Sequence, residues 1–169
     1  MAKRPFLMWP DKRLRQVAEP VGEITDAVRA VWQDMLDSMY AMPGVGLAAP
    51  QIGVMLRLAV VDCSDTKKAP LRMADPELLH VSERFAEREE GSPNLPHVSA
   101  KIKRPRGITV AYTDHAGMRT RQDFVGLWAV SVQHQIDHLN GMMYFDHLGP
   151  VKRKMLIDKS RKLARRGGA

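Results

Sequence analysis

The stretch Gln133-His134-Gln135-Ile136-Asp137-His138 places two histidines four residues apart in a segment whose apolar pattern predicts an α-helix. Residues at i and i+4 lie on one face of a helix, so both imidazoles can bind the same metal ion. In the zinc-hydrolase pattern H-E-x-x-H, the glutamate takes a proton from metal-bound water. Here that position is Gln135, whose amide accepts no proton near neutral pH. The stretch therefore predicts a hydrolase-like helix without its general base.

Two questions stay open for this stretch. Histidines four residues apart also occur by chance on surface helices, but the surrounding residues here are apolar, and an unpaired imidazole is costly in an apolar setting. Asp137 either orients one of the histidines through a hydrogen bond or belongs to an ion pair. Other stretches of the chain support the metal-site interpretation.

The composition is that of a folded domain without membrane spans. The 169 residues are 44% hydrophobic, so the chain is long enough to bury about 70% of its unfolded surface. We expect a single domain over residues 1–169. No apolar run approaches the ~20 residues that span a bilayer, so no membrane partner is expected. Cys63 is the only cysteine, which excludes an intrachain disulfide and favours the reducing cytoplasm.

The net charge of +7 is concentrated at the C-terminal end. Eight basic side chains and one acidic side chain follow Pro150, while the rest of the chain holds 18 basic and 18 acidic side chains. We expect a basic helix over residues 151–166, with a narrow apolar stripe of Val151, Met155 and Leu163. Its natural partners are anionic, such as the ribosome or rRNA. The alternative is a solvated helix that only improves solubility.

Outward from the histidine stretch, the pattern predicts mixed helices and strands. The histidine helix is expected from about Phe124 to Leu139, with Asp123 as its N-cap, and an earlier amphipathic helix from the N-cap Thr25 to about Tyr40. Residues 84–91 are highly charged, and residues 92–96, with two prolines, are expected to be irregular. Strands are expected at residues 55–62, 73–81, 107–112 and 118–122. In the strand at 73–81, a proline at position 76 is expected to limit pairing.

Three stretches in this order resemble the motifs of peptide deformylases. The first stretch, Gly44-Val-Gly-Leu-Ala-Ala-Pro-Gln51, resembles the family pattern G-x-G-x-A-A-x-Q. The second, Glu89-Glu-Gly-Ser-Pro-Asn-Leu-Pro96, resembles E-G-C-L-S. The third, Gln133-His-Gln-Ile-Asp-His138, resembles Q-H-E-x-D-H. The resemblance covers nearly the whole chain. It implies an α+β fold, with antiparallel sheets around a central metal-site helix and a helix at the C-terminal end.

The resemblance also implies a metal site with one altered ligand. Family members hold Fe²⁺ or Zn²⁺ through two histidines and the cysteine of the second motif, which correspond to His134, His138 and Ser92 here. A serine hydroxyl is a poor ligand, because its alkoxide does not form near neutral pH, whereas a thiolate forms readily on a metal. We therefore expect Zn²⁺ or Fe²⁺ to bind weakly, and a metal-free protein is compatible with the sequence.

Further positions carry over from the family's catalytic machinery. Gln51 matches a side chain that donates to the developing oxyanion. Pro93 replaces a leucine whose backbone N–H is the second donor, and proline has no N–H. Gln135 stands at the position of the general-base glutamate. The peptide-binding positions of the first motif correspond to Gly44, Gly46 and Leu47.

Two functions are consistent with these residues. The first is a deformylase-like protein that retains a peptide-binding pocket for nascent N-termini, with impaired or no removal of the N-formyl group. The second is an active metal-dependent deformylase or related amide hydrolase with an altered ligand set, in which Glu89 or Glu90 serves as the base. Purified protein that holds stoichiometric metal and turns over formyl-Met peptides would favour the second function.

Overall fold

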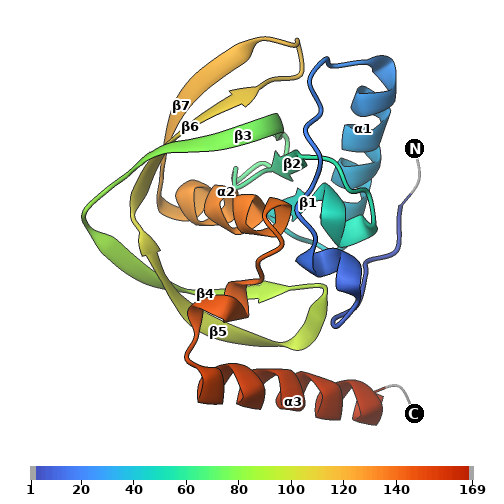
Figure 1. Cartoon of the computed structure of the whole chain (residues 1–169), viewed down its shortest axis with the longest axis vertical. Coiled ribbons are helices and arrows are strands. Elements are labelled where there is room, and N and C mark those ends of the chain that lie inside the picture. The colour runs from blue at the N-terminus through green and yellow to red at the C-terminus, as the bar shows by residue number, and fades with distance from the viewer. Residues whose placement is uncertain (1–2, 168–169) are drawn as a thin grey trace.

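Helix α2 (Gly126–Leu139) runs through the middle of the molecule, between a five-stranded sheet and a separate two-stranded hairpin (Figure 1). The computed structural model describes residues 3–167. The expected α+β fold is confirmed, because antiparallel sheets surround the helix that carries the two histidines and another helix follows at the C-terminal end. Within residues 3–167, no helix has the length and apolar character needed to cross a bilayer. The single-domain expectation over residues 1–169 stays a prediction.

The larger sheet is antiparallel throughout, with strand order β1-β2-β3-β6-β7. All four predicted strands belong to it, although the one expected at residues 55–62 begins only at Leu58. The register between β3 and β6 shifts between Ala74 and Glu77, which flank Pro76, as expected for a residue without an N–H. The strands are β1 (Gly46–Ala48), β2 (Leu58–Val61), β3 (Leu71–Val81), β6 (Gly107–Thr113) and β7 (Arg119–Val125).

Helix α1 (Asp26–Ala41) confirms the amphipathic helix predicted after Thr25. The Thr25 hydroxyl accepts a hydrogen bond from the backbone N–H of Val28 at 3.3 Å, which satisfies one of the free donors at the helix start. The apolar stripe faces the sheet, and Trp32 and Met35 are fully buried there. This packing fixes the loop that leaves α1 and leads into the first deformylase-like motif.

The smaller sheet corrects the irregular structure predicted for residues 92–96, of which only residues 93 and 94 form a turn. The charged segment and the two-proline segment form a hairpin of β4 (Phe85–Ser92) and β5 (Leu95–Pro105), joined by a two-residue turn. The sequence pattern hides β4 because the strand is mostly charged, and only Glu90 and Ser92 are buried on it. Strand β5 does show the usual alternation of a strand, with Val98, Ala100 and Ile102 between exposed polar residues, and this signal was missed.

The start of α2 also differs from the prediction. Asp123 lies in β7 and accepts a hydrogen bond from the Thr109 hydroxyl at 2.6 Å, so it does not cap the helix. The helix begins at Gly126, after an extended Val125 that provides no side-chain cap. The strand therefore continues three residues further than expected, because β7 pairs with β6 as far as Val125.

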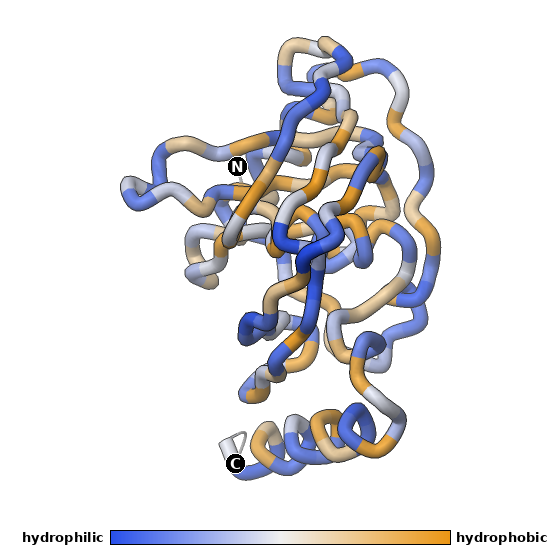
Figure 2. The backbone as a smooth tube through the Cα atoms, turned by 90° about the vertical axis from the view of Figure 1, so that its left-hand side faces the viewer, coloured by the Kyte–Doolittle hydropathy of each residue, from blue (hydrophilic) through white to orange (hydrophobic). Residues whose placement is uncertain are grey.

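Helix α3 (Pro150–Gly167) confirms the expected C-terminal helix, but it packs through a different face. Leu156 and Ile157 contact the cluster around Ile102 of β5, whereas Val151 and Met155 are 72% and 67% exposed. The expected stripe is wrong at these two positions because the Ser160 hydroxyl donates to the Pro96 carbonyl at 2.6 Å and fixes another orientation. Figure 2 shows α3 along one end of the molecule, with hydrophilic residues through most of its length.

Candidate active site

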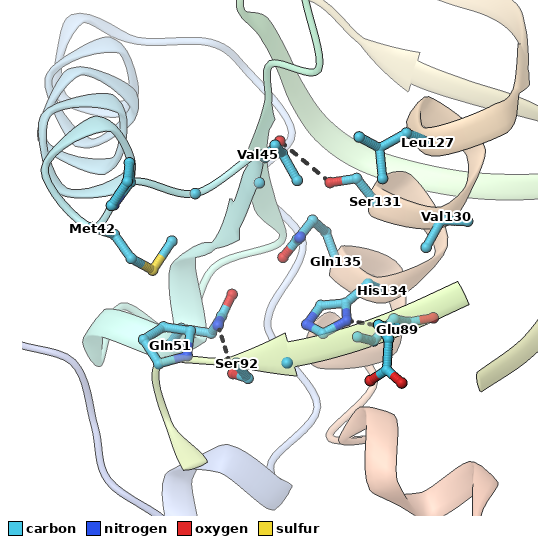
Figure 3. Close-up of a pocket in the computed structure, with 16 residues that line it drawn as sticks. Met42, Val45, Gln51, Glu89, Ser92, Leu127, Val130, Ser131, His134 and Gln135 are labelled. Atoms are coloured by element: carbon cyan, nitrogen blue, oxygen red, sulfur yellow. Dashed lines mark hydrogen bonds and ion pairs between the residues drawn. The ribbon is translucent and has the colours of Figure 1, made fainter. Parts of the chain in front are cut away.

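A cavity of about 360 Å³ lies between the loop after α1, the end of β4 and one face of α2 (Figure 3). We call it the main pocket. All three deformylase-like motifs contribute to its wall, although they are far apart in the sequence. The lining residues are Met42 to Gly46, Gln51, Glu89 to Pro93, Leu127, Val130, Ser131, His134 and Gln135.

The two histidines meet edge to edge at the inner end of this pocket. His134 Nδ1 lies 2.9 Å from a carboxylate oxygen of Glu90, and His134 Nε2 lies 3.1 Å from His138 Nε2. Because a carboxylate only accepts, we assign the proton of His134 to Nδ1, which leaves a lone pair on Nε2. His138 is 1% exposed, and its burial is the main cause that lowers its pKa well below the ordinary value. His138 is therefore neutral and donates from Nε2 to His134.

The pair supplies two of the donors that a metal site needs, but no third one of the usual kind. Within residues 3–167, no group of three or more histidine, cysteine, aspartate and glutamate side chains is arranged to hold a metal ion. Ser92, at the third position, donates its hydroxyl proton to the Asn94 side-chain oxygen at 2.9 Å. A neutral hydroxyl that is already bonded is a weak ligand. The residues present therefore do not fit the complete metal site that the family pattern implies.

Gln51 is buried beneath the pocket and its amide is fully hydrogen-bonded. Its oxygen accepts from the backbone N–H of Ala48 at 2.9 Å, and its nitrogen donates to Asn94 at 2.7 Å and Ser92 at 3.3 Å. An oxyanion in the pocket would have to replace one of these two acceptors. The residue is positioned firmly by this network, and its role as a donor to substrate stays a prediction.

Gln135 fills the position next to the histidines and packs against the first motif. A Cβ at position 46 would lie 2.5 Å from the Gln135 nitrogen, so the amide can approach the chain only because residue 46 is glycine. The Gln135 oxygen is buried and has no hydrogen-bond partner among residues 3–167. A buried acceptor without a donor costs about 1–3 kcal/mol, which a ligand N–H could offset.

The other motif positions divide between pocket wall and core. Gly44, Gly46 and Pro93 line the main pocket. Leu47 is fully buried in the core cluster below β1 and does not reach the pocket. Pro93 lies in the tight turn between β4 and β5, where it offers no backbone donor.

Glu90 belongs to a buried ion network that fixes the histidine helix to the β4–β5 hairpin. Arg104 binds it through two hydrogen bonds of 2.7 and 2.9 Å, and Arg104 also donates to Asp137 at 2.9 Å. Burial alone would raise the pKa of Glu90, but the hydrogen bonds from His134 and Arg104 hold it below the ordinary value. Asp137 further contacts His147 at 2.8 Å. Of the two readings of Asp137, the ion pair is therefore the one observed.

The same network determines which carboxylate of the pocket could act as the general base. Both carboxylate oxygens of Glu90 are bonded to Arg104, and one also bonds His134, so Glu90 is not free to take a proton from substrate water. Glu89 is exposed at the rim of the pocket. It is the remaining carboxylate among the lining residues.

Two residues of this site had no role in the sequence interpretation. Arg104 lies on the inner face of β5, two residues after the buried Ile102, but the strand itself was not predicted. Asn94 lies in the second motif, and no role was predicted for its side chain. Its side chain is fully buried and donates to the backbone oxygens of Leu7 at 2.6 Å and Gln51 at 3.2 Å. The available signal was the asparagine in a short segment between strands, which is typical of turns.

Comparison with known sequences gives a consistent family match. A model of the family described as Polypeptide deformylase matches residues 3–154. The peptide deformylase of Rhodopseudomonas palustris (strain TIE-1) is 42% identical over 171 aligned residues, covering 99% of this chain and 98% of that protein. The peptide deformylase of Methylocella silvestris is 43% identical and covers 98% of this chain and 87% of that protein.

Solved structures agree with the fold. The crystal structure of a peptide deformylase from Legionella pneumophila superposes with a TM-score of 0.93 at 39% identity, covering 99% of this chain and 98% of that one. A peptide deformylase from Ehrlichia chaffeensis in complex with actinonin has a TM-score of 0.92 at 32% identity, covering 98% and 99%. The expected fold is thereby confirmed over nearly the whole chain.

Proposed function

The chain belongs to the peptide deformylase family, and from this premise we propose that its main pocket binds the N-terminal ends of nascent polypeptides, with slow or absent removal of the formyl group. The observation that supports this is the chemistry around the histidine pair. Glu90 is bonded to His134 and to Arg104. Gln135, which follows His134 in the helix and lines the same pocket, has a buried oxygen without a hydrogen-bond partner among residues 3–167. The Gln135 oxygen can accept a hydrogen bond from a peptide N–H group. Among the described residues, the pocket lacks a free proton acceptor beside the position that the formyl carbon would occupy.

Three replacements in one mechanism support the loss of rate. A missing oxyanion donor, as at Pro93, typically costs about 10²–10³-fold in kcat. A missing general base, as at Gln135, costs a comparable ~10²–10⁴-fold. The hydroxyl of Ser92 weakens the hold on the family's metal ion, whose chemistry would be to activate water. These costs do not simply add, but each one acts on the same step.

A second function is an active deformylase with an altered ligand set, and the comparisons favour it. Peptide deformylases act on nascent peptide N-termini with a bound metal ion, and relatives that are 42–43% identical carry that name. The main pocket and the histidine pair are present. In this function Glu89 is the available carboxylate for the role of base.

One pair of measurements separates the two functions. Purified protein loaded with Fe²⁺ or Zn²⁺ is assayed for release of formate from formyl-Met peptides, and binding of the same peptides is measured by calorimetry. We expect measurable binding with turnover reduced by at least ~10³-fold relative to an active family member. Turnover at the rate of an active member would establish the second function.

Metal content provides an independent criterion. We expect less than one metal ion per chain after purification from supplemented medium, because two imidazoles and a hydroxyl form a weak set of ligands. Elemental analysis measures this directly. A stoichiometric metal that survives dialysis against a chelator would contradict the weak-binding part of the proposal.

We further propose that α3 binds the ribosome through rRNA phosphates, which places the protein in the cytoplasm with its substrates. Most of the eight basic side chains after Pro150 are exposed on this helix, and two of the eight are paired, Lys154 with Asp158 and Arg153 with Asp146. Each phosphate contact adds to the salt dependence of binding. Ribosome pelleting at low and high salt tests it, with Lys159→Glu/Lys162→Glu as the variant and Lys67→Glu/Lys68→Glu as the control. Equal pelleting of both variants would leave α3 as a solvated helix.

A further inference from the structure

A second cavity, of about 560 Å³, lies at the N-terminal end of α2. Val130 lines both this cavity and the main pocket, so the two adjoin along the helix. Four arginines contribute to its wall, and we call it the arginine cavity. They are Arg84, Arg88, Arg104 and Arg106.

The charge of this cavity is not balanced. Arg104 is neutralised by Glu90 and Asp137. In the part of the chain that the structure describes, the guanidinium groups of the other three arginines form no hydrogen bond or ion pair. Glu83 is the one unpaired carboxylate among the lining residues. Three free guanidinium groups against one carboxylate make the cavity attractive to anions.

Backbone hydrogen bonds fix the chain at two of these arginines, Arg84 and Arg106. The N–H of Arg106 donates to the carbonyl of Arg84 at 2.9 Å, and the N–H of Ser82 donates to the carbonyl of Gly107 at 2.9 Å. These bonds close the base of the β4–β5 hairpin. The backbone positions of Arg84 and Arg106 are therefore fixed relative to each other before any ligand arrives.

Strand β4 connects the two cavities. Its end, from Glu89 to Ser92, lines the main pocket, and Arg88 lines the arginine cavity. Among the described strands β4 pairs only with β5, so its other edge is open. A peptide lying extended along this edge advances about 3.3 Å per residue, which brings its third to seventh residues beside Arg88 and Arg84.

We propose that the arginine cavity binds carboxylate side chains of a polypeptide whose N-terminal residue occupies the main pocket. The protein then selects chains with aspartate or glutamate a few residues after the first. This inference rests on the proposed binding of peptide N-termini. Guanidinium groups bind carboxylates through two parallel hydrogen bonds, which gives the selection its geometry.

The test uses fluorescent formyl-Met peptides of about nine residues that differ only in carrying glutamate or glutamine at positions four to six. Anisotropy titration of the full chain measures both affinities at low and high salt. We expect the glutamate peptide to bind about fivefold more tightly at low salt, with the difference reduced at high salt. The variant Arg88→Gln/Arg106→Gln should lose this preference and keep its affinity for the glutamine peptide, which also shows that it folds.

A matched control is Arg121→Gln, because Arg121 is exposed on β7 and lines neither cavity. It should keep the full preference. Equal affinity of the two peptides for the natural protein, or a preference that survives in the double variant, would overturn the proposal. So would a short single-stranded RNA that binds more tightly than the glutamate peptide and loses affinity in the double variant, since the occupant would then be polyphosphate.

Failure of the proposed function is distinguishable from failure of this inference. If neither formyl-Met peptide binds, the main pocket does not receive N-termini. An N-acetylated glutamate peptide without the leading formyl-Met then tests the arginine cavity alone. Binding that is lost in Arg88→Gln/Arg106→Gln supports the affinity for carboxylates, and no binding overturns it.

Discussion

At the scale of single residues, small chemical differences decide what the main pocket can do. Gln135 has nearly the shape of glutamate, but its amide remains neutral and cannot take a proton from water. The carboxylate nearest to the histidine pair, Glu90, is bonded on both oxygens. The three motifs therefore build one pocket, and the chemistry that this pocket supports depends on the residues at positions 92, 93 and 135.

Replacing Ser92, Pro93 and Gln135 by the residues of the family pattern should increase deformylase activity. We expect Ser92→Cys/Pro93→Leu/Gln135→Glu to bind one metal ion per chain and to gain deformylase activity by at least ~10²-fold over the natural chain. A thiolate would complete the ligand set, a backbone N–H would return, and a carboxylate would lie beside the histidines. Elemental analysis and formate release measure the two effects.

The single variants serve as controls for this restoration. None of the three alone should recover most of the activity, because the missing parts act on one step. Full activity from Gln135→Glu alone would show that Ser92 and Pro93 are compatible with catalysis. The interpretation of the second motif would then be wrong.

Arg104 is the residue on which the buried network depends. Its replacement by methionine leaves Glu90 and Asp137 without their main partner, and the carboxylate of Glu90 is almost fully buried. Breaking one side of a buried ion network typically costs about 3–5 kcal/mol. We expect Arg104→Met to lower the free energy of unfolding in urea by about this amount. Arg121→Met, at an exposed position, should change it by less than about 0.5 kcal/mol.

At the scale of elements, the sequence predicted best where one face is buried and the other exposed. Helix α1 has a clear apolar stripe, and its cap Thr25 was identified correctly. The β4–β5 hairpin was missed because β4 is mostly charged and solvated, although the alternation of Val98, Ala100 and Ile102 with polar residues in β5 was an available signal. The stripe of α3 was misplaced because the orientation of that helix depends on a bond from Ser160 to Pro96, which no local pattern reveals.

The candidate site could also be predicted only in part from the sequence. The histidine pair and Gln51 could be identified from spacing and family motifs, whereas the pairing of Glu90 with Arg104 joins residues 14 apart across the unpredicted hairpin. Contacts of this kind depend on strand register, which was not available from the sequence.

The end of α2 offers a test of element packing. Gly141 follows this helix with φ of +74°, and a Cβ there would lie 2.4 Å from the backbone oxygen of Arg15. A left-handed alanine costs about 1–2 kcal/mol, and the clash with backbone atoms adds to it. We expect Gly141→Ala to lower the free energy of unfolding by more than about 2 kcal/mol in urea titration.

Gly117 supplies the matched control. It also has a positive φ, of +84°, but a Cβ there would meet no atom of residues 3–167 within 4 Å. Gly117→Ala should therefore show the cost of the backbone conformation alone, about 1 kcal/mol. Equal losses in the two variants would mean that the contact between Gly141 and Arg15 relaxes freely.

At the scale of the whole molecule, polar pairs outside the pocket link distant parts of the chain. Arg15 is paired with Asp146, so the 3₁₀ turn at Lys12–Arg15 is joined to the one at Tyr144–His147. The Tyr40 hydroxyl donates to Asp62 at 2.5 Å and joins α1 to the end of β2. These pairs make the stability of the fold depend on pH at both extremes.

Asp146 makes the stability of the fold depend on pH under acidic conditions. Burial alone would raise its pKa, but hydrogen bonds from Arg15 and the Met143 backbone hold it below 3.8, the ordinary value. A carboxylate whose folded pKa is depressed stabilises the fold above its unfolded pKa, and this stability is lost as the pH falls through the folded pKa. We expect the urea midpoint to decrease below about pH 3.8, and to decrease less steeply in Asp146→Asn. An identical acid profile in the variant would contradict this assignment.

Tyr40 makes the stability of the fold depend on pH under alkaline conditions. Burial, together with its bond to Asp62, raises the pKa of Tyr40 from 10.0 to about 12. A group whose folded pKa is raised stabilises the fold below its unfolded pKa, and the stability is lost as the pH rises through the folded pKa. The midpoint should therefore decrease between about pH 10 and pH 12, and Tyr40→Phe should remove that part of the decrease.

The bonds around Asn94 have a consequence for the order in which the protein is made. Its side chain donates to Leu7, which lies 87 positions earlier, and the backbone N–H of Trp9 donates to the Asn94 carbonyl. During synthesis the segment with Leu7 and Trp9 leaves the ribosome before Asn94 does. It cannot form these hydrogen bonds until the turn between β4 and β5 has also emerged. The histidine helix emerges later still. A growing chain of this protein therefore has no pocket until most of its own length has been translated.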